Sequence, residues 1–228
     1  MIETPIAAKP TQRNSRDAQR SREALLRAAE ALFAERGFEG ASLGEIAAAA
    51  GLSRGTPNYF FGSKAELYRG VLESAFERRE EATRRACAPL IDWVGAPASA
   101  PIERPLEKAV DGYLVFLLDH PAFLRLVLRE ELAGGAVLRE VPRSSQAIEE
   151  AFAAVRELAG SHGIAAFDVV DVVLLFVSLT FFPASQGSTF MAALDRDLGD
   201  RKTRGRHVKF VVDQLGASIR GADLPSGS

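Results

Sequence analysis

The sequence has little of the chemistry that builds disulfides, metal centres or membrane spans. One cysteine, Cys87, among 228 residues allows no intrachain disulfide, and its scarcity fits a reducing cytoplasm. The three histidines, His120, His162 and His207, are far apart, and none lies at a helical spacing from another metal-binding side chain. The longest apolar run, residues 172–182, is too short to cross a bilayer. We expect a cytoplasmic protein without a metal, a cofactor or a membrane anchor.

Strand patterns are also missing, because no stretch alternates apolar and polar residues between hairpin turns. Helical spacing of apolar residues runs through nearly the whole chain instead. It predicts a first helix at residues 21–36, which Gly37 should end, with Phe38 placed for the hydrophobic contact that accompanies such an end. After a proline-rich loop at residues 94–105, further helices are expected at 105–119, 121–133, 143–160, 167–182 and 202–220. The sequence predicts an all-α fold.

The distribution of charge is mildly uneven. The net charge is −2, but residues 1–85 carry 14 basic and 12 acidic groups, and residues 1–22 carry five and two. No signal-peptide pattern is present in residues 1–22, and we expect residues 1–20 to form a basic flexible arm. That arm could be a solubilising end or could reach the minor groove of DNA. The charged run at residues 77–85 is interpreted as a solvated helix face.

A helix-turn-helix pattern follows the first helix. Ser42 and Glu45 form a Ser-x-x-Glu capping box, so a helix should begin there. Gly51 interrupts the alanine-rich stretch that follows, and Ser53 is placed to cap a second short helix at residues 54–61. Two short helices joined by a glycine-containing turn are typical of proteins that read the major groove of DNA.

The predicted second helix carries side chains suited to base recognition. A helical wheel of this helix turns Pro57 inward, and Pro57 lacks an N–H at the fourth helical position, so we expect a short or distorted helix. Arg54 on the outer face suits guanine O6 and N7, and Asn58 suits adenine N6 and N7. Phe60 or the Thr56 methyl group suits a thymine methyl.

The first helix, the turn and the run Phe61-x-x-Lys64-x-x-Leu67 resemble the TetR family of bacterial transcription regulators over residues 22–76. The resemblance implies a homodimer with small DNA-binding domains and a larger domain that binds a small molecule and releases DNA. It also implies that Lys64 contacts a DNA phosphate. Where the family usually has Leu-Tyr-Tyr-His-Phe, residues 57–61 read PNYFF, so no operator sequence can be transferred from a relative.

These observations predict a basic arm (1–20), a helix-turn-helix domain (21–76, motif 42–61), a helical domain for effector binding and dimerisation (77–222) and a disordered tail (223–228). The expected function is a sequence-specific transcriptional regulator, a repressor that a small-molecule effector releases from a near-palindromic double-stranded DNA operator. The residues predicted to contact DNA are Ser42, Ser53, Arg54, Gly55, Thr56, Asn58, Tyr59, Phe60 and Lys64.

Apolar and aromatic residues of the later helices supply two further predictions. A largely apolar effector pocket is assigned to Trp93, Tyr113, Phe116, Phe123, Phe152 and Phe176. A four-helix dimer interface is assigned to Val172, Leu175, Phe176, Leu179, Val208, Val211, Val212 and Leu215, because one protomer rarely buries an all-round apolar helix at its own edge.

Three other interpretations remain open. The chain could be a helical protein-interaction module with a vestigial helix-turn-helix. Residues 40–44 match the G-x-S-x-G pattern of hydrolases, but a helix precedes them where that motif needs a strand, and Ser42 is already explained as a helix cap, so we expect no catalysis. Cys87 could sense redox state, although no second cysteine is present to resolve an oxidised thiol.

Overall fold

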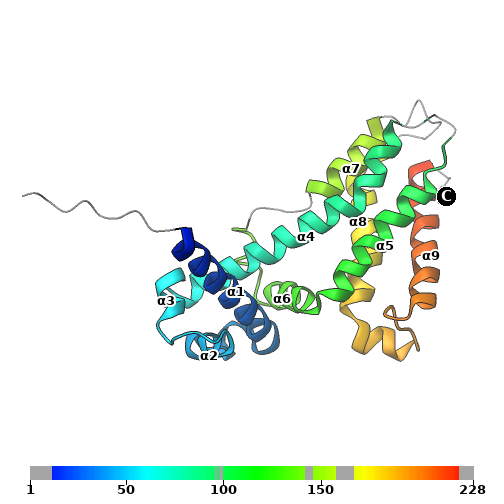
Figure 1. The fold of residues 1–228 in the computed structure, drawn as a ribbon. Coiled ribbons are helices and arrows are strands. Elements are labelled where there is room, and N and C mark those ends of the chain that lie inside the picture. The colour runs from blue at the N-terminus through cyan, green and yellow to red at the C-terminus, as the bar shows by residue number, and fades with distance from the viewer. Residues whose placement is uncertain (1–11, 96, 98–99, 142–145, 158–166, 221–228) are drawn as a thin grey trace, which may run out of the picture. The chain divides into compact units, whose positions relative to one another are not determined.

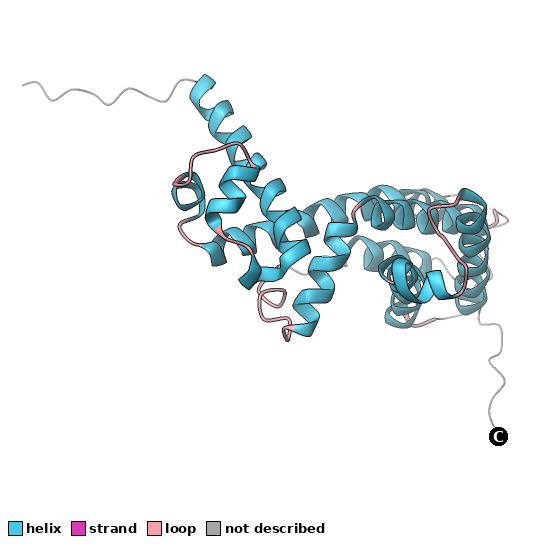
Figure 2. Cartoon of the chain, turned by 90° about the horizontal axis from the view of Figure 1, so that it is seen from below, coloured by secondary structure: helices cyan, strands magenta, loops and turns pink. Residues whose placement is uncertain are grey.

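The computed structural model describes residues 12–95, 97, 100–141, 146–157 and 167–220, and its regular elements are helices (Figure 1). Figure 2 shows these helices joined by loops, with no strand in the part of the chain that is described. The all-α fold that the sequence predicts is confirmed. In chain order the elements are α1 (Gln12–Gly40), α2 (Leu43–Ala49), α3 (Thr56–Phe61), α4 (Lys64–Val94), α5 (Glu103–Asp119), α6 (Pro121–Leu132), α7 (Gln146–Glu157), α8 (Val169–Ser185), the π-helical turn η2 (Gly187–Met191) and α9 (Arg201–Arg220).

The chain divides into two compact units, residues 1–74 and 75–228, whereas the sequence pattern placed the division after residue 76. Helix α4 therefore belongs to both units. Residues 1–11 of the expected arm and the predicted tail at 223–228 lie outside the described residues. None of the described helices is long and apolar enough to cross a membrane.

Helix α1 begins well before the position that the apolar pattern predicts. It starts at Gln12, so residues 12–20 are helical and do not form a flexible arm. Ser21 is not a helix cap, because its hydroxyl donates to the Asp17 carbonyl at 3.0 Å inside the helix. No proline or glycine interrupts this stretch, and its arginine and glutamine side chains favour helix. An apolar pattern could not reveal these turns because they carry almost no apolar side chains.

The end of α1 follows the prediction more closely. Gly37 has non-helical backbone angles (φ 77°, ψ 176°), which break the helix even though helical turns resume up to Gly40. A positive φ of this kind strains residues with a side chain, so glycine suits the position. Phe38 then packs against Phe33, with ring centroids 6.1 Å apart, and both rings contact Tyr68 of α4.

The core of the first unit is made by one face of each of its helices. Its buried side chains include Leu25 and Phe33 of α1, Ile46 of α2, and Leu67 and Leu72 of α4. Helix α2 packs against both α1 and α3. This small core holds α3 at the surface of the unit, where its outer side chains are accessible.

The second unit is a helical bundle around α5. Helix α5 packs against α8 and α9, and α7 packs against α8. The helices predicted in this half of the sequence are present as α5 to α9, and the ends of the helix predicted at 143–160 lie outside the described residues. Tyr113 of α5, Phe152 of α7 and Phe176 of α8 are completely buried where these helices meet.

A histidine of α9 completes the backbone hydrogen bonding of α8. Pro183 lies inside α8 and has no N–H to donate to the carbonyl of Leu179, one turn earlier. His207 Nε2 lies 2.8 Å from that carbonyl oxygen and therefore donates to it from α9. This contact gives His207 a structural role at the junction of the two helices.

Candidate nucleic-acid interface

The start of α2 is fixed by the predicted capping box. Ser42 Oγ accepts a hydrogen bond from the Glu45 N–H at 3.2 Å, and the Glu45 carboxylate accepts from the Ser42 N–H at 3.0 Å. The Ser42 hydroxyl also donates to Glu45 Oε2 at 2.6 Å. The N–H groups of Ser42 and Glu45 therefore both have hydrogen-bond partners, and Ser42 Oγ is bonded to Glu45.

Glu45 also ties α2 to the end of α1. Arg36 NH1 lies 2.9 Å from Glu45 Oε1 in an ion pair at the surface. The hydrogen bonds from Ser42, above all from its hydroxyl, and then the Arg36 charge lower the pKa of Glu45 below its usual value. The carboxylate therefore stays ionised as the common partner of two helices.

The turn and α3 differ from the predicted helix at residues 54–61. Helix α3 begins at Thr56 and its N-terminal cap is Gly55, so Ser53 is not the cap and Arg54 is not helical. Pro57 explains the shift, because it occupies the second helical position, where its missing N–H costs no hydrogen bond. The Ser53 carbonyl instead accepts from the Thr56 N–H at 3.0 Å within the turn.

Helix α3 turns two side chains fully outward, Asn58 and Tyr59. Pro57 is buried as predicted, whereas Asn58 is exposed and Tyr59 is 83% exposed. The Tyr59 ring meets the half-buried Phe60 ring edge to face, with centroids 5.0 Å apart. Phe61, predicted to face inward, is half-buried.

Lys64 is held in place at the first position of α4. Its ammonium donates to the Glu39 carbonyl at 3.4 Å and lies 4.5 Å from the centre of the Phe38 ring. A cation above an aromatic face is stabilised by the ring quadrupole. The lysine charge is therefore positioned beside the N-terminus of α2 before any ligand is bound.

Four of the predicted DNA-contacting residues line one cleft of about 520 Å³ in the first unit: Ser42, Arg54, Asn58 and Lys64. The Arg54 side chain crosses α2 at Gly44, where an added Cβ would lie 3.5 Å from Arg54 Nε. Glu39 and Glu45 also line the cleft, and Arg36 offsets the second of these charges. The other predicted residues, Ser53, Gly55, Thr56, Tyr59 and Phe60, lie in the turn or on α3 and do not line this cleft.

The residues assigned to an effector pocket form part of the second unit's core. Tyr113 and Phe152 both pack on Phe176, with ring centroids 5.3 and 5.9 Å apart, and Phe116 packs on Phe123 at 5.8 Å. All six assigned side chains are buried. Of these, Trp93 also lines a cavity of the second unit.

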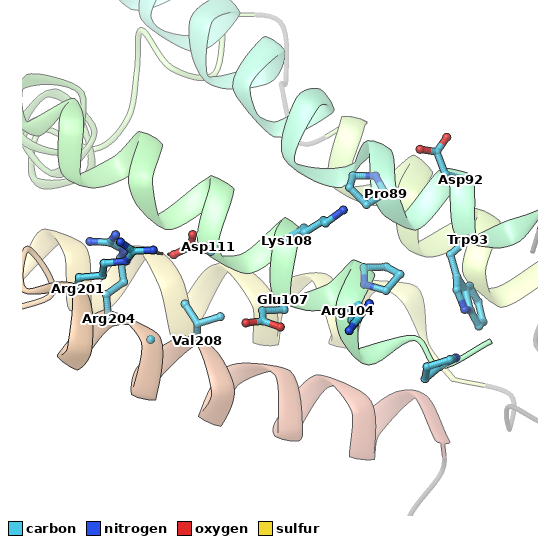
Figure 3. A pocket seen from close by; sticks show the side chains of 13 residues that line it. Pro89, Asp92, Trp93, Arg104, Glu107, Lys108, Asp111, Arg201, Arg204 and Val208 are labelled. Atoms are coloured by element: carbon cyan, nitrogen blue, oxygen red, sulfur yellow. Dashed lines mark hydrogen bonds and ion pairs between the residues drawn. The ribbon is translucent and has the colours of Figure 1, made fainter. Parts of the chain in front are cut away.

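That cavity is an open groove of about 950 Å³ lined by residues of α4, α5 and α9. Figure 3 shows α5 between the other two helices. Its lining is largely charged, so it does not match the apolar pocket that the sequence predicts. Arg204 of α9 pairs with Asp111 of α5 at 3.2 Å across it. The Trp93 indole N–H is already used, because it donates to the Ala100 carbonyl at 2.9 Å.

A buried arginine was missed by the sequence analysis. Arg79 lies in the charged run interpreted as solvated, but it is buried, and its Nε donates to the Tyr113 hydroxyl at 3.2 Å. Its guanidinium also lies 5.9 Å from the ring centres of Phe76 and Tyr113. The helical phase could have revealed it, because Arg79 continues the buried stripe of Leu72 and Ala75.

Cys87 and the histidines have structural surroundings. Burial, with a smaller contribution from the Glu80 charge, raises the pKa of the Cys87 thiol to about 12, which disfavours the thiolate that a redox sensor needs. His120 Nδ1 lies 2.7 Å from the Phe116 carbonyl oxygen. His162 lies outside the described residues. Within the part of the chain that is described, no three metal-binding side chains come together.

The side chains assigned to the dimer interface lie mostly on the inner sides of α8 and α9. Six of the eight are buried in the protomer's own core: Val172, Phe176, Val208, Val211, Val212 and Leu215. Leu175 and Leu179 are half-buried against the same core. The exposed apolar side chains are Val170 (63%), Leu174 (58%) and Phe182 (50%) on α8 and Phe210 (50%) on α9.

Two family models match the chain. Residues 25–71 match the bacterial regulatory proteins of the tetR family, and residues 103–215 match the tetracyclin repressor-like C-terminal domain. Together the matched segments include α2, α3 and most of the second unit.

Named relatives agree with these matches. The HTH-type transcriptional repressor NicS of Pseudomonas putida is 26% identical over 87% of this chain and 92% of its own. The HTH-type transcriptional regulator RutR of Escherichia coli is 33% identical over 60% of each chain. Two solved structures share the fold: a protein from Mesorhizobium loti described as a TetR-family regulator (TM-score 0.65, 21% identity, 91% and 98% coverage) and a TetR family regulator from Marinobacter aquaeolei (TM-score 0.65, 15% identity, 90% and 98% coverage).

Proposed function

Because this chain belongs to the TetR family of bacterial transcriptional regulators, we propose that it is a repressor which a small-molecule effector releases from operator DNA. The observation that carries the DNA-binding part is the cleft that joins Ser42, Arg54, Asn58 and Lys64 beside α3. It combines a fixed cation and a helix N-terminus, which suit phosphate, with exposed side chains that suit base edges.

We assign two kinds of contact within this surface. Arg54 and Asn58 read guanine and adenine, and Phe60 or the Thr56 methyl group, both half-buried, contacts a thymine methyl group. Lys64 contacts a phosphate and fixes the position of α3 along the groove. The turn position of Arg54 supports its role, because a side chain that precedes a short helix is less confined by neighbouring turns than one within it.

We propose a homodimer through the exposed apolar side chains of α8 and α9: Val170, Leu174, Phe182 and Phe210. Exposed apolar side chains on adjacent helices suit a two-fold contact between identical surfaces. Such a dimer presents one α3 per protomer, so its operator would be a near-palindrome with half-sites about 34–36 Å apart.

We assign effector binding to the second unit. Helix α4 supports this assignment, because the same helix begins with Lys64 in the first unit and places Arg79 against Tyr113 in the core of the second. A ligand that moves α4 there would also displace Lys64 from its phosphate. The aromatic side chains packed around Tyr113 in the core of the second unit favour a largely apolar or aromatic effector.

The test is selection of duplex DNA from a random pool by the purified full chain, followed by titration of the selected duplex and a scrambled duplex of equal length. We expect a near-palindromic site and a marked preference for it over the scrambled duplex. Equal affinity for the two would overturn the proposal and favour the protein-interaction module. A survey of apolar, aromatic and sugar-like compounds should then find that the first two classes release DNA.

A further inference from the structure

Gly44 lies in the first turn of α2, where the backbone does not require a glycine. Helix α2 runs from Leu43 to Ala49, and Gly44 is not among the glycines with a positive φ. Glycine is unfavourable inside a helix, because it loses more backbone freedom than any other residue when the helix forms. The glycine at this position therefore needs another physical reason.

The space beside Gly44 is filled by the side chain of Arg54. A Cβ added at Gly44 would lie 3.5 Å from Arg54 Nε, 3.9 Å from its Cγ and 4.0 Å from its Cζ. Apart from the adjoining residues and the backbone of α2, these are the three heavy atoms nearest to that Cβ. They lie at ordinary contact distances, so a methyl group has room, whereas a branched side chain would meet the arginine.

Arg54 has few other restraints. It precedes α3 in the turn, its side chain is exposed, and it makes no ion pair within the described residues. A free arginine side chain samples many rotamers, and fixing it on a base costs conformational entropy. Contact with α2 at Gly44 removes part of that freedom before DNA binds, and it keeps Arg54 in the cleft that Asn58 and Lys64 also line.

We propose that Gly44 is a positioning residue for base recognition, because the side chain that it lacks leaves the space in which Arg54 crosses α2. This inference rests on the proposed DNA-binding function. It gives a role to a residue that reads no base itself. A small residue at position 44 preserves the base preference that Arg54 supplies, and a branched one removes that preference by displacing the guanidinium.

The test is a steric series at position 44 in the full chain, measured on single-base variants of the selected operator. Gly44→Ala adds only the Cβ and should keep the base preference. Gly44→Val adds two further carbons and should reduce the preference by about 5- to 150-fold, the discrimination of one bidentate contact. This loss should fall at the operator position that Arg54→Ala relaxes. The control Gly205→Val, in α9, adds a side chain where a Cβ meets nothing within 4 Å and should bind DNA like the unaltered chain.

A double variant shows whether Gly44 acts through Arg54. In Arg54→Ala the space beside Gly44 is vacated, so adding Gly44→Val should cause no further loss of base preference. The valine displaces an exposed arginine and not a core residue, so its urea midpoint should stay close to that of the unaltered chain. Gly44→Leu repeats the comparison with a better helix former.

The other outcomes separate this inference from the proposed function. Full base preference in Gly44→Val and Gly44→Leu would overturn the inference and leave the proposed function standing. A loss at another operator position, or a further loss in the Arg54→Ala background, would also overturn it, because residue 44 would then act on DNA directly. If Arg54→Ala itself left the base preference unchanged, the inference would fail with the role assigned to Arg54. An unaltered chain that selects no sequence would overturn the proposed function.

Discussion

At the scale of the residue, the proposed interface contains cations with different surroundings. Lys64 is held by the Glu39 carbonyl and the Phe38 ring, and Arg36 is paired with Glu45. Arg54 is exposed and makes no ion pair in the part of the chain that is described. A restrained charge suits a fixed phosphate position, whereas an unpaired guanidinium is available for a bidentate contact with a base.

The first prediction separates these two roles by mutation. Arg54→Ala should weaken operator binding by about 1–3 kcal/mol per half-site and relax base preference at one position. Lys64→Ala should weaken all sequences similarly and lower the salt slope by about one per half-site. Binding titrations on a set of single-base operator variants distinguish the two effects. A change of base preference in Lys64→Ala, with none in Arg54→Ala, would show that the two assignments are reversed.

The second prediction concerns the carboxylate that joins α1 and α2. The pKa of Glu45 is lowered in the folded state by Ser42 and Arg36, so the unfolded chain takes up the proton first as the pH falls. The stabilisation from Glu45 should therefore be fully present above the unfolded pKa of about 4.5 and be lost as the pH falls through the lower folded value.

Glu45→Gln should consequently lower the urea midpoint at pH 7, and its difference from the unaltered chain should shrink towards pH 3. Glu39→Gln serves as the control, since the exposed Glu39 carboxylate takes part in no described ion pair. A Glu45→Gln deficit that stays constant from pH 7 to pH 3 would argue against the charge as its cause.

Local sequence predicted some residues of the site better than others. The Ser42 cap was predictable because a capping box depends on four neighbouring residues. The burial of Arg79 depends on Tyr113, which is distant in sequence, and a charged run conceals the helical phase that places Arg79 inside. Residue type alone therefore misplaced a side chain that hydrogen-bonds to Tyr113, one of the residues assigned to the effector pocket.

At the scale of the element, two prolines shape two helices. Pro57 affects where α3 begins, and Pro183 removes a backbone donor inside α8. Pro57 allows α3 to begin at Thr56 and leaves Arg54 in the turn, a result that follows from the missing N–H once its helical position is known. The helical position of Pro57 could not be predicted from the sequence, because Ser53 is also a suitable N-terminal cap and would start the helix two residues earlier. The helix that results is short, as the proline led us to expect.

The third prediction concerns Pro183, Leu179 and His207. His207→Ala should leave the part-buried Leu179 carbonyl without this donor and lower the free energy of unfolding by about 0.5–1.5 kcal/mol. Pro183→Ala restores an N–H that can bond to the same carbonyl within α8. Adding it to His207→Ala should therefore recover part of the loss, and a double-mutant cycle in urea measures the coupling. Strictly additive effects would mean that the two residues do not share this carbonyl.

At the scale of the whole molecule, α8 shows why an apolar pattern alone does not indicate which side of a helix is free to contact a partner. Its side chains are apolar on nearly every side, so the pattern identified an important helix without revealing which side faces α5, α7 and α9. Packing within the protomer decides that orientation, and it uses the very residues that the sequence assigned to the partner. The exposed side was therefore found from the fold.

The fourth prediction follows from that exposed side. Leu174→Asp/Phe210→Asp places two charges where the proposed contact is apolar, and it should shift a micromolar sample from dimer to monomer in light scattering. Glu149→Ala/Lys209→Ala alters exposed positions without adding charge to this patch and should leave the mass unchanged. A dimer that survives the aspartate pair would place the contact on another surface.

The burial of Cys87 has a practical consequence for measuring this protein's motions. A buried thiol with a pKa of about 12 should not react with maleimides or with Ellman's reagent until the chain unfolds. A new cysteine at an exposed site such as Lys209 would then be the single reactive thiol in each folded chain. Paired probes could follow changes in the distance between protomers on addition of DNA or effector, with no need to replace the native cysteine first.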